Sequence, residues 1–541
     1  MSALRLRARL ATLLNFVSQA AANAAALCFV VTLAGCGGGS EVMMGPPPPS
    51  APPQIVTPSV AGGMATFPYS QTIEADSGTP PFTWSVSSGV LPQNLSLGPP
   101  SGRTITISGT PTSAESETFT LEVKDSANMA DSRAFTINVK ALTAVQLQEV
   151  AGSAPGDSIE IQGLSAGAFN PSEWLQETLN WVPDVRAPMF ASQPGAWQNV
   201  YAPWALEQPN GWRLFYGGWD GTDTPNDRVY SGTTSDFLSF ANRHLVIDHG
   251  PFQHVNNANV TQLPDGSLHM LYGYLAGGTN GLDKIGYVSS QDGVTWNGVP
   301  EPYTAQVSDS VTVTNDPIYP TQDYNGGNVL LRESNSWTMY YSKGAYGQGN
   351  GNVYRATSTE PPVFNAAGTA LASSLYANDV KKFTVAGQDW YVMVLYYEAL
   401  NVGEPPAGFS YSMSLDGIQF RLARDLFGGA GAEDKFPTTP SFVTQNGRIL
   451  GVLYGWDRLD YLDGQNSIFA RWLQKNVVLQ DSMGAQYPAS GSYGPDRQWF
   501  LVPASGTLQG TITIFAEDGV TPLGSGPVTL TAGKSYQFIA P

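Results

Sequence analysis

The chain has 541 residues, 42% of them hydrophobic and 11% aromatic, so it is long enough for several domains and can fill their cores. This composition excludes an intrinsically disordered chain. The net charge of −18 argues against nucleic acid as a partner. Short runs rich in Thr, Val, Tyr and Phe alternate with turn residues, which include 58 glycines and 40 prolines, and this pattern predicts an all-β protein.

Residues 1–35 have the layout of a secretory signal, because arginines precede a long apolar stretch. The stretch is followed by Leu-Ala-Gly-Cys at residues 33–36, which resembles a bacterial lipobox. The resemblance implies that residues 1–35 are removed, that Cys36 is lipidated, and that the protein is anchored in the cell envelope, at the outer membrane. An ordinary cleaved signal and a membrane anchor are the alternatives. Cleavage would remove three arginines and no acidic residue, so the net charge would change from −18 to −21.

The segment 36–53 is rich in Gly and Pro and predicts a flexible tether. Residues 54–140 then contain short alternating runs that predict a small β-sandwich. Its motifs, among them Ile107-Ser-Gly109-Thr-Pro111, resemble the immunoglobulin-like domains of bacterial surface proteins, which implies a spacer. Four strands are expected, at 83–86, 104–108, 119–123 and 134–139.

The connecting segment 141–186 predicts one helix, with Asn170 as its N-cap, Pro171 in its first position and apolar residues as far as Leu179. The same segment contains Gly163-Leu-Ser165-Ala-Gly167, which matches the nucleophile elbow of esterases. No alternation of strands and helices follows, so chance is the better explanation of this match.

Two repeated motifs organise residues 187–479. In the first, a hydroxyl, an acid and an aromatic ring recur in fixed register, which predicts a tight turn whose acid accepts backbone N–H bonds. Its four copies are Thr234–Phe240, Ser290–Trp296, Ser358–Phe364 and Ser414–Phe420. In the second, apolar residues precede a tyrosine, in five copies that end at Tyr216, Tyr272, Tyr341, Tyr396 and Tyr454. Copies spaced about 60 residues apart predict a β-propeller of five blades.

Each blade is expected to begin with an inner strand, and the openings of these strands should surround one shallow axial pocket. The fifth blade lacks the turn motif, so we expect a strand from elsewhere to complete it. Residues 480–541 predict a small C-terminal β appendage, with 141–163 as its partner. The five openings are expected at Tyr201–Pro203, Asn257–Asn259, Asn315–Pro317, Asn378–Val380 and Thr438–Pro440.

The five-blade period, the turn motif and openings such as Asn315-Asp316-Pro317 together resemble the five-bladed propeller glycosidases of families 43 and 32. The resemblance covers a little over half of the chain and implies three carboxylates, from different inner strands, that meet on the axis. It assigns Asp316, which precedes a proline, to the stabilising position. It also directs Asp379, at the opening of the next blade, into the same pocket. For both aspartates, a turn that starts a strand is the alternative explanation.

Ala202 stands where this resemblance places the base or nucleophile. Either another acid supplies the missing role, or the site does not hydrolyse. The acids expected nearby are Glu398, which we take as the third catalytic candidate, Glu404 and Asp220.

Five further residues near the openings are candidates for substrate binding. The alternative for the histidine is a solvated loop position, and the alternative for the tryptophan is packing within a blade. The candidates are Tyr201, Trp204, His254, Asn257 and Asn259.

No cofactor is expected, because the sequence has no paired Cys/His ligands and no phosphate-cradling glycine loop. Asp-rich loops at 220–227 and 457–463 make calcium a candidate structural ion, although neither matches a defined ligand loop. The sequence therefore predicts no metal at the site itself.

These expectations combine into a surface-tethered, carbohydrate-active protein, a glycoside hydrolase that acts on a poly- or oligosaccharide in the axial pocket. The alternative is a non-catalytic glycan-binding or adhesion lipoprotein that lacks the first-blade carboxylate. A purely structural envelope protein is the third hypothesis. The residues around Ala202 separate the first two, because a third carboxylate favours the enzyme and an asparagine-lined opening favours the binder.

Overall fold

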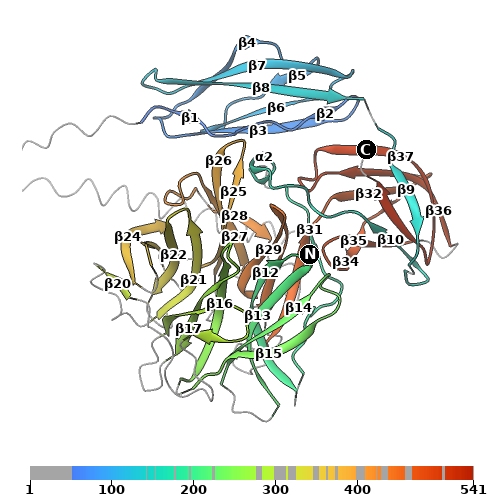
Figure 1. The fold of residues 1–541 in the computed structure, drawn as a ribbon. Coiled ribbons are helices and arrows are strands. Elements are labelled where there is room, and N and C mark those ends of the chain that lie inside the picture. Colours follow the sequence, from blue (N-terminus) through green and yellow to red (C-terminus); the bar gives the residue numbers. More distant parts are fainter. Residues whose placement is uncertain are drawn as a thin grey trace, which may run out of the picture. The chain divides into compact units, whose positions relative to one another are not determined.

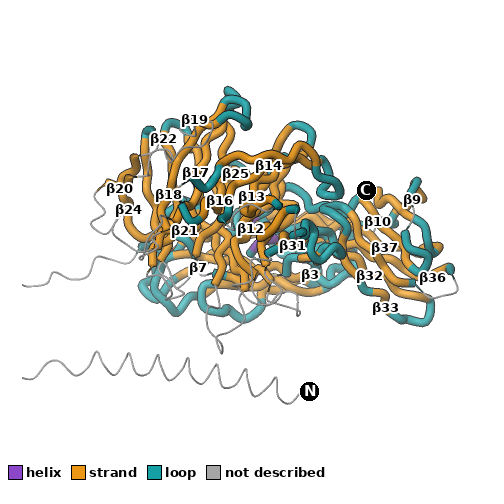
Figure 2. The backbone as a smooth tube through the Cα atoms, turned by 90° about the horizontal axis from the view of Figure 1, so that it is seen from below, coloured by secondary structure: helices purple, strands orange, loops and turns teal. Residues whose placement is uncertain are grey.

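The structure is a computed structural model, and its description covers residues 51–141, 143–152, 154–175, 178–193, 196–221, 226–250, 252–275, 283–297, 312–314, 324–344, 352–360, 363–371, 376–397, 408–421, 423–427, 437–456, 466–502 and 506–539. Within these residues strands predominate, and the one helix is α2 (Pro171–Trp174). Figure 2 shows this distribution along the backbone, with strands drawn in orange. The all-β prediction is confirmed.

Helix α2 begins as predicted and ends early. The Asn170 side chain accepts a hydrogen bond from the Ser172 amide at 3.1 Å, and Pro171 is the first helical residue. The helix stops at Trp174, one turn long, whereas the sequence predicts apolar helical positions as far as Leu179. The buried Trp174 ring packs edge-on against Tyr411, so tertiary contact rather than helix length fixes this segment.

The N-terminal part of the described chain is a sandwich of two four-stranded sheets, with strand orders β1-β3-β6-β5 and β2-β8-β7-β4. Alternate residues face a shared core that includes Ile73, Ile107, Leu121 and Ile137. All four predicted strands are present, each longer than predicted. Their bounds are β1 (Gln54–Ile55), β2 (Gly63–Met64), β3 (Tyr69–Asp76), β4 (Thr83–Gly89), β5 (Leu95–Leu97), β6 (Thr104–Gly109), β7 (Glu115–Lys124) and β8 (Ala130–Lys140).

The described residues that follow contain five sheets, in which the strands pair antiparallel except for β20 and β24. Figure 1 labels most of their strands. Three sheets have four consecutive strands each: β12 (Trp197–Gln208), β13 (Gly211–Asp220), β14 (Arg228–Thr234) and β15 (Ala241–Ile247); β16 (His254–Gln262), β17 (Leu268–Leu275), β18 (Asp283–Ser290) and β19 (Trp296–Asn297); β25 (Tyr376–Val385), β26 (Gln388–Tyr397), β27 (Gly408–Ser414) and β28 (Arg424–Phe427). A further sheet has β21 (Tyr324–Glu333), β22 (Ser336–Gly344), β23 (Asn352–Ser358), β24 (Val363–Leu371) and, parallel to β24, β20 (Thr312–Thr314).

The remaining sheet of this group closes with a strand from elsewhere in the chain, as the sequence predicts. Its order is β11-β31-β30-β29, with β11 (Trp181–Pro183), β29 (Pro437–Gln445), β30 (Arg448–Trp456) and β31 (Ser467–Leu473). Strand β11 lies within residues 141–186, for which the sequence predicts a connecting segment. Pairing of β11 with β31 therefore joins the beginning of this region to its end.

The first strands of the five sheets contact one another in a closed cycle, β12 to β16, β21, β25, β29 and back to β12. We call this arrangement the ring, and the end at which its first strands begin the mouth. The second strand of every sheet carries its tyrosine of the repeated motif in a buried position: Tyr216, Tyr272, Tyr341, Tyr396 and Tyr454. The ring is propeller-like, and it positions the candidate site.

The acidic turn motif lies at the end of the ring opposite the mouth, between the third and fourth strands. Asp292 Oδ1 accepts the amides of Val294 at 2.8 Å and Thr295 at 2.7 Å, and Asp416 accepts two amides in the same way. The closing ring Trp296 is buried. These acids are structural, as the motif predicts.

At the mouth, each first strand contains a break in its pairing register at an equivalent position. In four of them a residue there has positive φ: Ala202 at 49°, Asn257 at 51°, Gly327 at 58° and Thr439 at 48°. The third strand differs from the prediction. Strand β21 supplies Gly327 and Asn328 at this level, whereas Asn315–Pro317, the predicted opening, lies outside the described residues.

The C-terminal part forms two further sheets, and the prediction that 141–163 contributes to them is confirmed. Strands β9 (Gln146–Val150) and β10 (Ser158–Gln162) join β34 (Ala489–Ser492), β35 (Arg497–Leu501) and β38 (Ser535–Ile539). The other sheet consists of β32 (Asn476–Asp481), β33 (Gln486–Tyr487), β36 (Thr507–Phe515) and β37 (Pro522–Thr531). Ser165 of the elbow-like motif donates to Asp496 at 2.8 Å, and the next described helix begins only at Pro171, whereas a nucleophile elbow leads directly into a helix.

Candidate functional site

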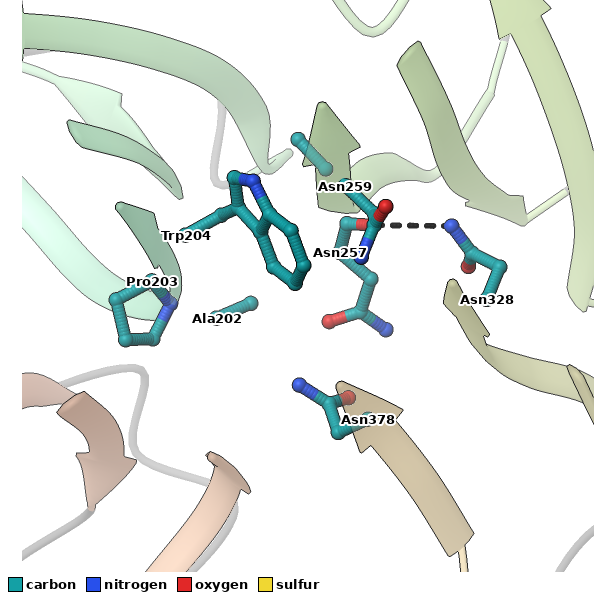
Figure 3. Close-up of a pocket in the computed structure, with 8 residues that line it drawn as sticks. Ala202, Pro203, Trp204, Asn257, Asn259, Asn328 and Asn378 are labelled. Atoms are coloured by element: carbon teal, nitrogen blue, oxygen red, sulfur yellow. Dashed lines mark hydrogen bonds between the residues drawn. The ribbon is translucent and has the colours of Figure 1, made fainter. Parts of the chain in front are cut away.

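A small cavity of about 10 Å³ lies at the mouth, where the first strands of four sheets meet. Its walls are side chains without charge: Ala202, Pro203, Trp204, Asn257, Ala258, Asn259, Asn328 and Asn378. Figure 3 shows the Asn257 and Asn378 amides directed into the same space beside Ala202. The cavity is therefore lined by four amides.

Three of these amides present a buried atom that has no hydrogen-bond partner in the described part of the chain: Asn257 Oδ1, Asn259 Nδ2 and Asn328 Oδ1. In two of these amides, one side-chain atom is hydrogen-bonded to the backbone, and this determines which atom is left unpaired. Asn259 Oδ1 accepts the Leu330 amide at 2.9 Å, and Asn328 Nδ2 donates to the Asn257 carbonyl at 3.2 Å. Because native structures pair nearly all buried polar groups with protein or ordered water, these three atoms call for a polar partner such as a water molecule.

Asp379 directly follows Asn378, which lines the cavity, but Asp379 itself does not line it. Its side chain is fully buried, and its Oδ2 lies 3.2 Å from Lys381 Nζ and accepts the Phe442 amide at 2.8 Å. Lys381 Nζ also lies 3.8 Å from the centre of the Trp204 ring. Burial raises the pKa of Asp379 and lowers that of Lys381, whereas their attraction opposes both shifts. The neighbouring Asn378, whose side chain donates to the Pro440 carbonyl, takes the position on the cavity.

Asp227, which directly precedes β14, is the centre of a second polar cluster at the mouth. It is 7% exposed, Asn199 Nδ2 donates to its Oδ1 at 2.8 Å, and the Tyr201 hydroxyl donates to its Oδ2 at 2.8 Å. Burial raises the pKa of Asp227, although the Asn199 hydrogen bond and the nearby His254 lower it. Asn256 donates to the same tyrosine hydroxyl, so the cluster joins β12 to β16.

Glycine makes room for this cluster on the second strands. A methyl group on Gly455 would lie 2.8 Å from Tyr201 Cβ, and one on Gly217 would lie 3.2 Å from the Tyr201 ring. Both glycines directly follow a tyrosine of the repeated motif. The half-buried Tyr201 therefore depends on two small neighbours from β13 and β30.

The structure brings the five predicted binding residues to the mouth and gives them different surroundings. Asn257 and Asn259 line the cavity, as does Trp204, which is 5% exposed and donates from Nε1 to the Val260 carbonyl at 3.0 Å. Trp204 is thus a wall of the cavity rather than a ring on its rim. Tyr201 and His254 belong to the Asp227 cluster. Their roles in binding stay predictions.

Asp220, a candidate for the missing acid, is paired with a cation. Arg243 donates to its two oxygens at 2.8 and 2.5 Å, and the guanidinium lies 4.3 Å from the centre of the Tyr230 ring. This pairing does not favour a catalytic role for Asp220. The other predicted acids, together with the lipidation site, lie outside the described residues: Asp316, Glu398, Glu404, Asp457, Asp460, Asp463 and Cys36.

Sequence reasoning missed three residues of the mouth. Asp227 appeared only within an Asp-rich loop, Asn328 lies after a Gly-Gly pair with no acid beside it, and Lys381 follows Asp379 at a spacing of two. That spacing is a usable signal, since residues i and i+2 of a strand share a face. No comparable signal pairs Asp227 with Tyr201, because the two are distant in sequence.

Neither a metal-binding cluster nor a membrane-spanning helix is found in the part of the chain that the structure covers. There, no three His, Cys, Asp or Glu side chains come together in a way that could hold a metal ion. Nor does any described helix have the length and apolar character needed to cross a bilayer.

Residues 49–140 match the family described as Putative Ig domain, in agreement with the sandwich. Among curated proteins, no sequence match was found. Solved structures similar to this chain include an α-L-arabinofuranosidase from Podospora anserina in complex with cellotriose, with 11% identity and a TM-score of 0.39 over 55% of this chain and 97% of that chain.

Two other similar structures are a glycoside hydrolase family 32 β-fructofuranosidase from Bombyx mori, with 10% identity, and a family 62 hydrolase in complex with xylotriose, with 14% identity. The first has a TM-score of 0.39 over 66% of this chain and 90% of that chain. The second has a TM-score of 0.38 over 55% of this chain and 98% of that chain.

Proposed function

We propose that this protein is a carbohydrate-active lipoprotein of the bacterial cell envelope that binds a neutral glycan at the mouth of a five-bladed propeller. The observation that carries the proposal is the mouth itself, where four amides line the cavity and the adjacent carboxylate of Asp379 is paired with Lys381. Amides donate and accept hydrogen bonds without charge, which suits sugar hydroxyls. The net charge of −18 disfavours an acidic glycan.

Backbone strain at the mouth supports the same location. Ala202 and Thr439 have φ values of 49° and 48°, and a β-branched residue such as Thr rarely adopts this conformation. Such backbone conformations cost free energy and persist only where the surrounding structure holds them. They are common at active sites and ligand sites. Four of the five first strands carry a residue with positive φ at this level. These positive φ angles are therefore consistent with a ligand site at the mouth.

Glycoside hydrolysis is the second candidate function, and Asp227 is the observation that favours it. A carboxyl group whose pKa is raised by burial is the kind of group that serves as a general acid. Hydrolysis would need a second carboxylate, for which Asp316 and Glu398 are the proposed residues. Lipidation at Cys36 would keep either activity at the cell envelope.

The test is to incubate the purified protein with neutral poly- and oligosaccharides built from glucose, xylose, arabinose and fructose, and to measure binding and released reducing sugar together. Binding without release supports the glycan-binding protein. Release that is lost in Asp316→Ala supports the hydrolase. Neither binding nor release from any member of the panel contradicts a carbohydrate-active function. Asn297→Asp, an exposed change on β19, is the matched control for handling of variants.

A further inference from the structure

Asn257, Asn259 and Asn328 line one cavity at the mouth and each has an unpaired amide atom, so the polarity of these atoms limits what can pair with them. Asn257 Oδ1 and Asn328 Oδ1 each need a donor, and Asn259 Nδ2 needs an acceptor. One oxygen atom that donates and accepts hydrogen bonds meets these needs, and a water molecule meets all three at once. Because backbone bonds fix Asn259 and Asn328, this polarity is built into the fold.

The size of the cavity limits its occupant to one such oxygen. A volume of about 10 Å³ is close to the roughly 10–15 Å³ that one water requires. A sugar ring is far larger, so only a single hydroxyl group that projects from a ring above the mouth could reach the amides. The ring itself would then lie over Ala202 and Asn378, which also line the cavity.

A metal ion does not suit the same atoms. Calcium takes about six to eight oxygen ligands, commonly with carboxylates among them, whereas the cavity offers two amide oxygens with no partner and one N–H group that would repel a cation. The charge of Asp379, which does not line the cavity, is compensated by Lys381 at 3.2 Å from Oδ2, while its buried Oδ1 has no partner in the described chain. The polarity of the cavity therefore favours a neutral oxygen.

We propose that Asn257, Asn259 and Asn328 form a hydroxyl-binding subsite, which holds a water in the free protein and a hydroxyl oxygen of a neutral glycan in the complex. The proposal rests on the proposed carbohydrate function and makes it specific. A hydroxyl has one proton to donate, so it satisfies one of the two acceptors. Rotation of the Asn257 amide by half a turn would present Nδ2 to the hydroxyl in place of Oδ1, and this would restore the third bond.

The first arm of the test is a high-resolution crystal structure of the protein, with and without calcium chloride. We expect one electron-density peak at about 2.7–3.2 Å from all three amide atoms, unchanged by calcium. A peak with contacts of about 2.3–2.6 Å and anomalous signal would identify a cation and overturn the proposal. The absence of any peak would overturn it too.

The second arm soaks these crystals with a neutral trisaccharide that binds in the solution panel. A sugar hydroxyl in the position of the peak supports the subsite. A trisaccharide that is bound at the mouth above an undisturbed water overturns the hydroxyl subsite and leaves the carbohydrate function standing. If no saccharide binds in solution, the proposed function fails first, and the two failures are distinguishable.

The third arm changes one hydrogen-bond donor of the subsite into an acceptor. Asn259→Asp keeps an oxygen for the Leu330 amide and replaces the unpaired N–H donor with an acceptor. We expect glycan affinity to fall about tenfold or more and terbium binding to appear, detected through energy transfer from Trp204. Asn297→Asp makes the same chemical change at an exposed position and should alter neither readout. An Asn259→Asp protein that is folded by circular dichroism and keeps wild-type affinity would contradict the subsite.

Discussion

The two ends of the ring are built from the same strands and differ in almost every chemical respect. At the turn end, Asp292 and Asp416 repeat one motif and each accepts two backbone amides. At the mouth, Ala202, Asn257 and Thr439 occupy equivalent positions with three different side chains. Several polar atoms there have no partner in the described chain. The turn end makes the fold regular, and the mouth departs from regularity where a ligand would bind.

The two ends should also respond to pH with opposite sign. Hydrogen bonds from the Thr295 and Val294 amides lower the pKa of Asp292 to about 2. Its contribution to stability is therefore complete above the unfolded pKa of about 4 and is lost as pH falls toward 2. Burial raises the pKa of Asp227 instead. Its contribution is complete below about pH 4 and is lost as pH rises through the folded pKa.

The largest effect is expected from Lys381→Met, which leaves the fully buried Asp379 carboxylate without its cation. Loss of one partner of a buried ion pair should lower the free energy of unfolding by about 3–5 kcal/mol. Urea unfolding followed by tryptophan fluorescence measures this loss.

The double variant Lys381→Met/Asp379→Leu is the control for this prediction. It removes both charges, so it should recover most of the stability that the single variant loses. Equal losses in the single and double variants would show that packing, and not charge, explains the effect.

A smaller loss is expected from Asp227→Ala, which leaves the Asn199 and Tyr201 donors without their acceptor. Buried donors of this kind cost about 1–3 kcal/mol when left unpaired. The loss should be greater at pH 4 than at pH 8, because ionisation of the buried Asp227 weakens its own contribution as pH rises. Unfolding curves at the two pH values check the sign, and a larger loss at pH 8 would contradict it.

The smallest effect is expected from Asp292→Ala at the exposed turn end, where two amides return to water. The variant should have a slightly lower Tm than the wild type at pH 7. The difference should shrink as pH falls toward 2, because half of the wild-type carboxyl groups are protonated at the pKa of about 2. Thermal unfolding across this range tests it, and a difference that does not shrink in acid would assign the effect to packing.

The regular end of the ring was predictable from the sequence for a physical reason. A turn that needs a hydroxyl, an acid and an aromatic ring in fixed register requires similar residues in each copy, as in Ser290–Trp296 and Ser414–Phe420. Buried tyrosines such as Tyr272 and Tyr454 repeat on the second strands for the same reason. The sequence predicts that a strand from elsewhere completes the fifth blade, but it does not identify β11 as that strand. A strand of three residues is too short to show a recognisable alternation of apolar and polar side chains.

The mouth was less predictable, because its neighbours are set by strand pairing and not by spacing. Asn257 and Asn259 were identified from position within the repeat and do line the cavity. Asp379 was expected to face the pocket, yet the register break between Ala377 and Asp379 directs Asn378 to the cavity and leaves the aspartate beside Lys381. A one-residue difference of this kind reverses which side chain faces the axis.

Binding of neutral and uronic-acid oligosaccharides of equal length, compared on one glycan array, shows whether the mouth is a site for neutral glycans. A mouth lined by amides beside a compensated carboxylate predicts binding to neutral members and at least about tenfold weaker binding to the acidic ones. Preference for uronic acids, or equal binding to both classes, would contradict a neutral glycan site at the mouth.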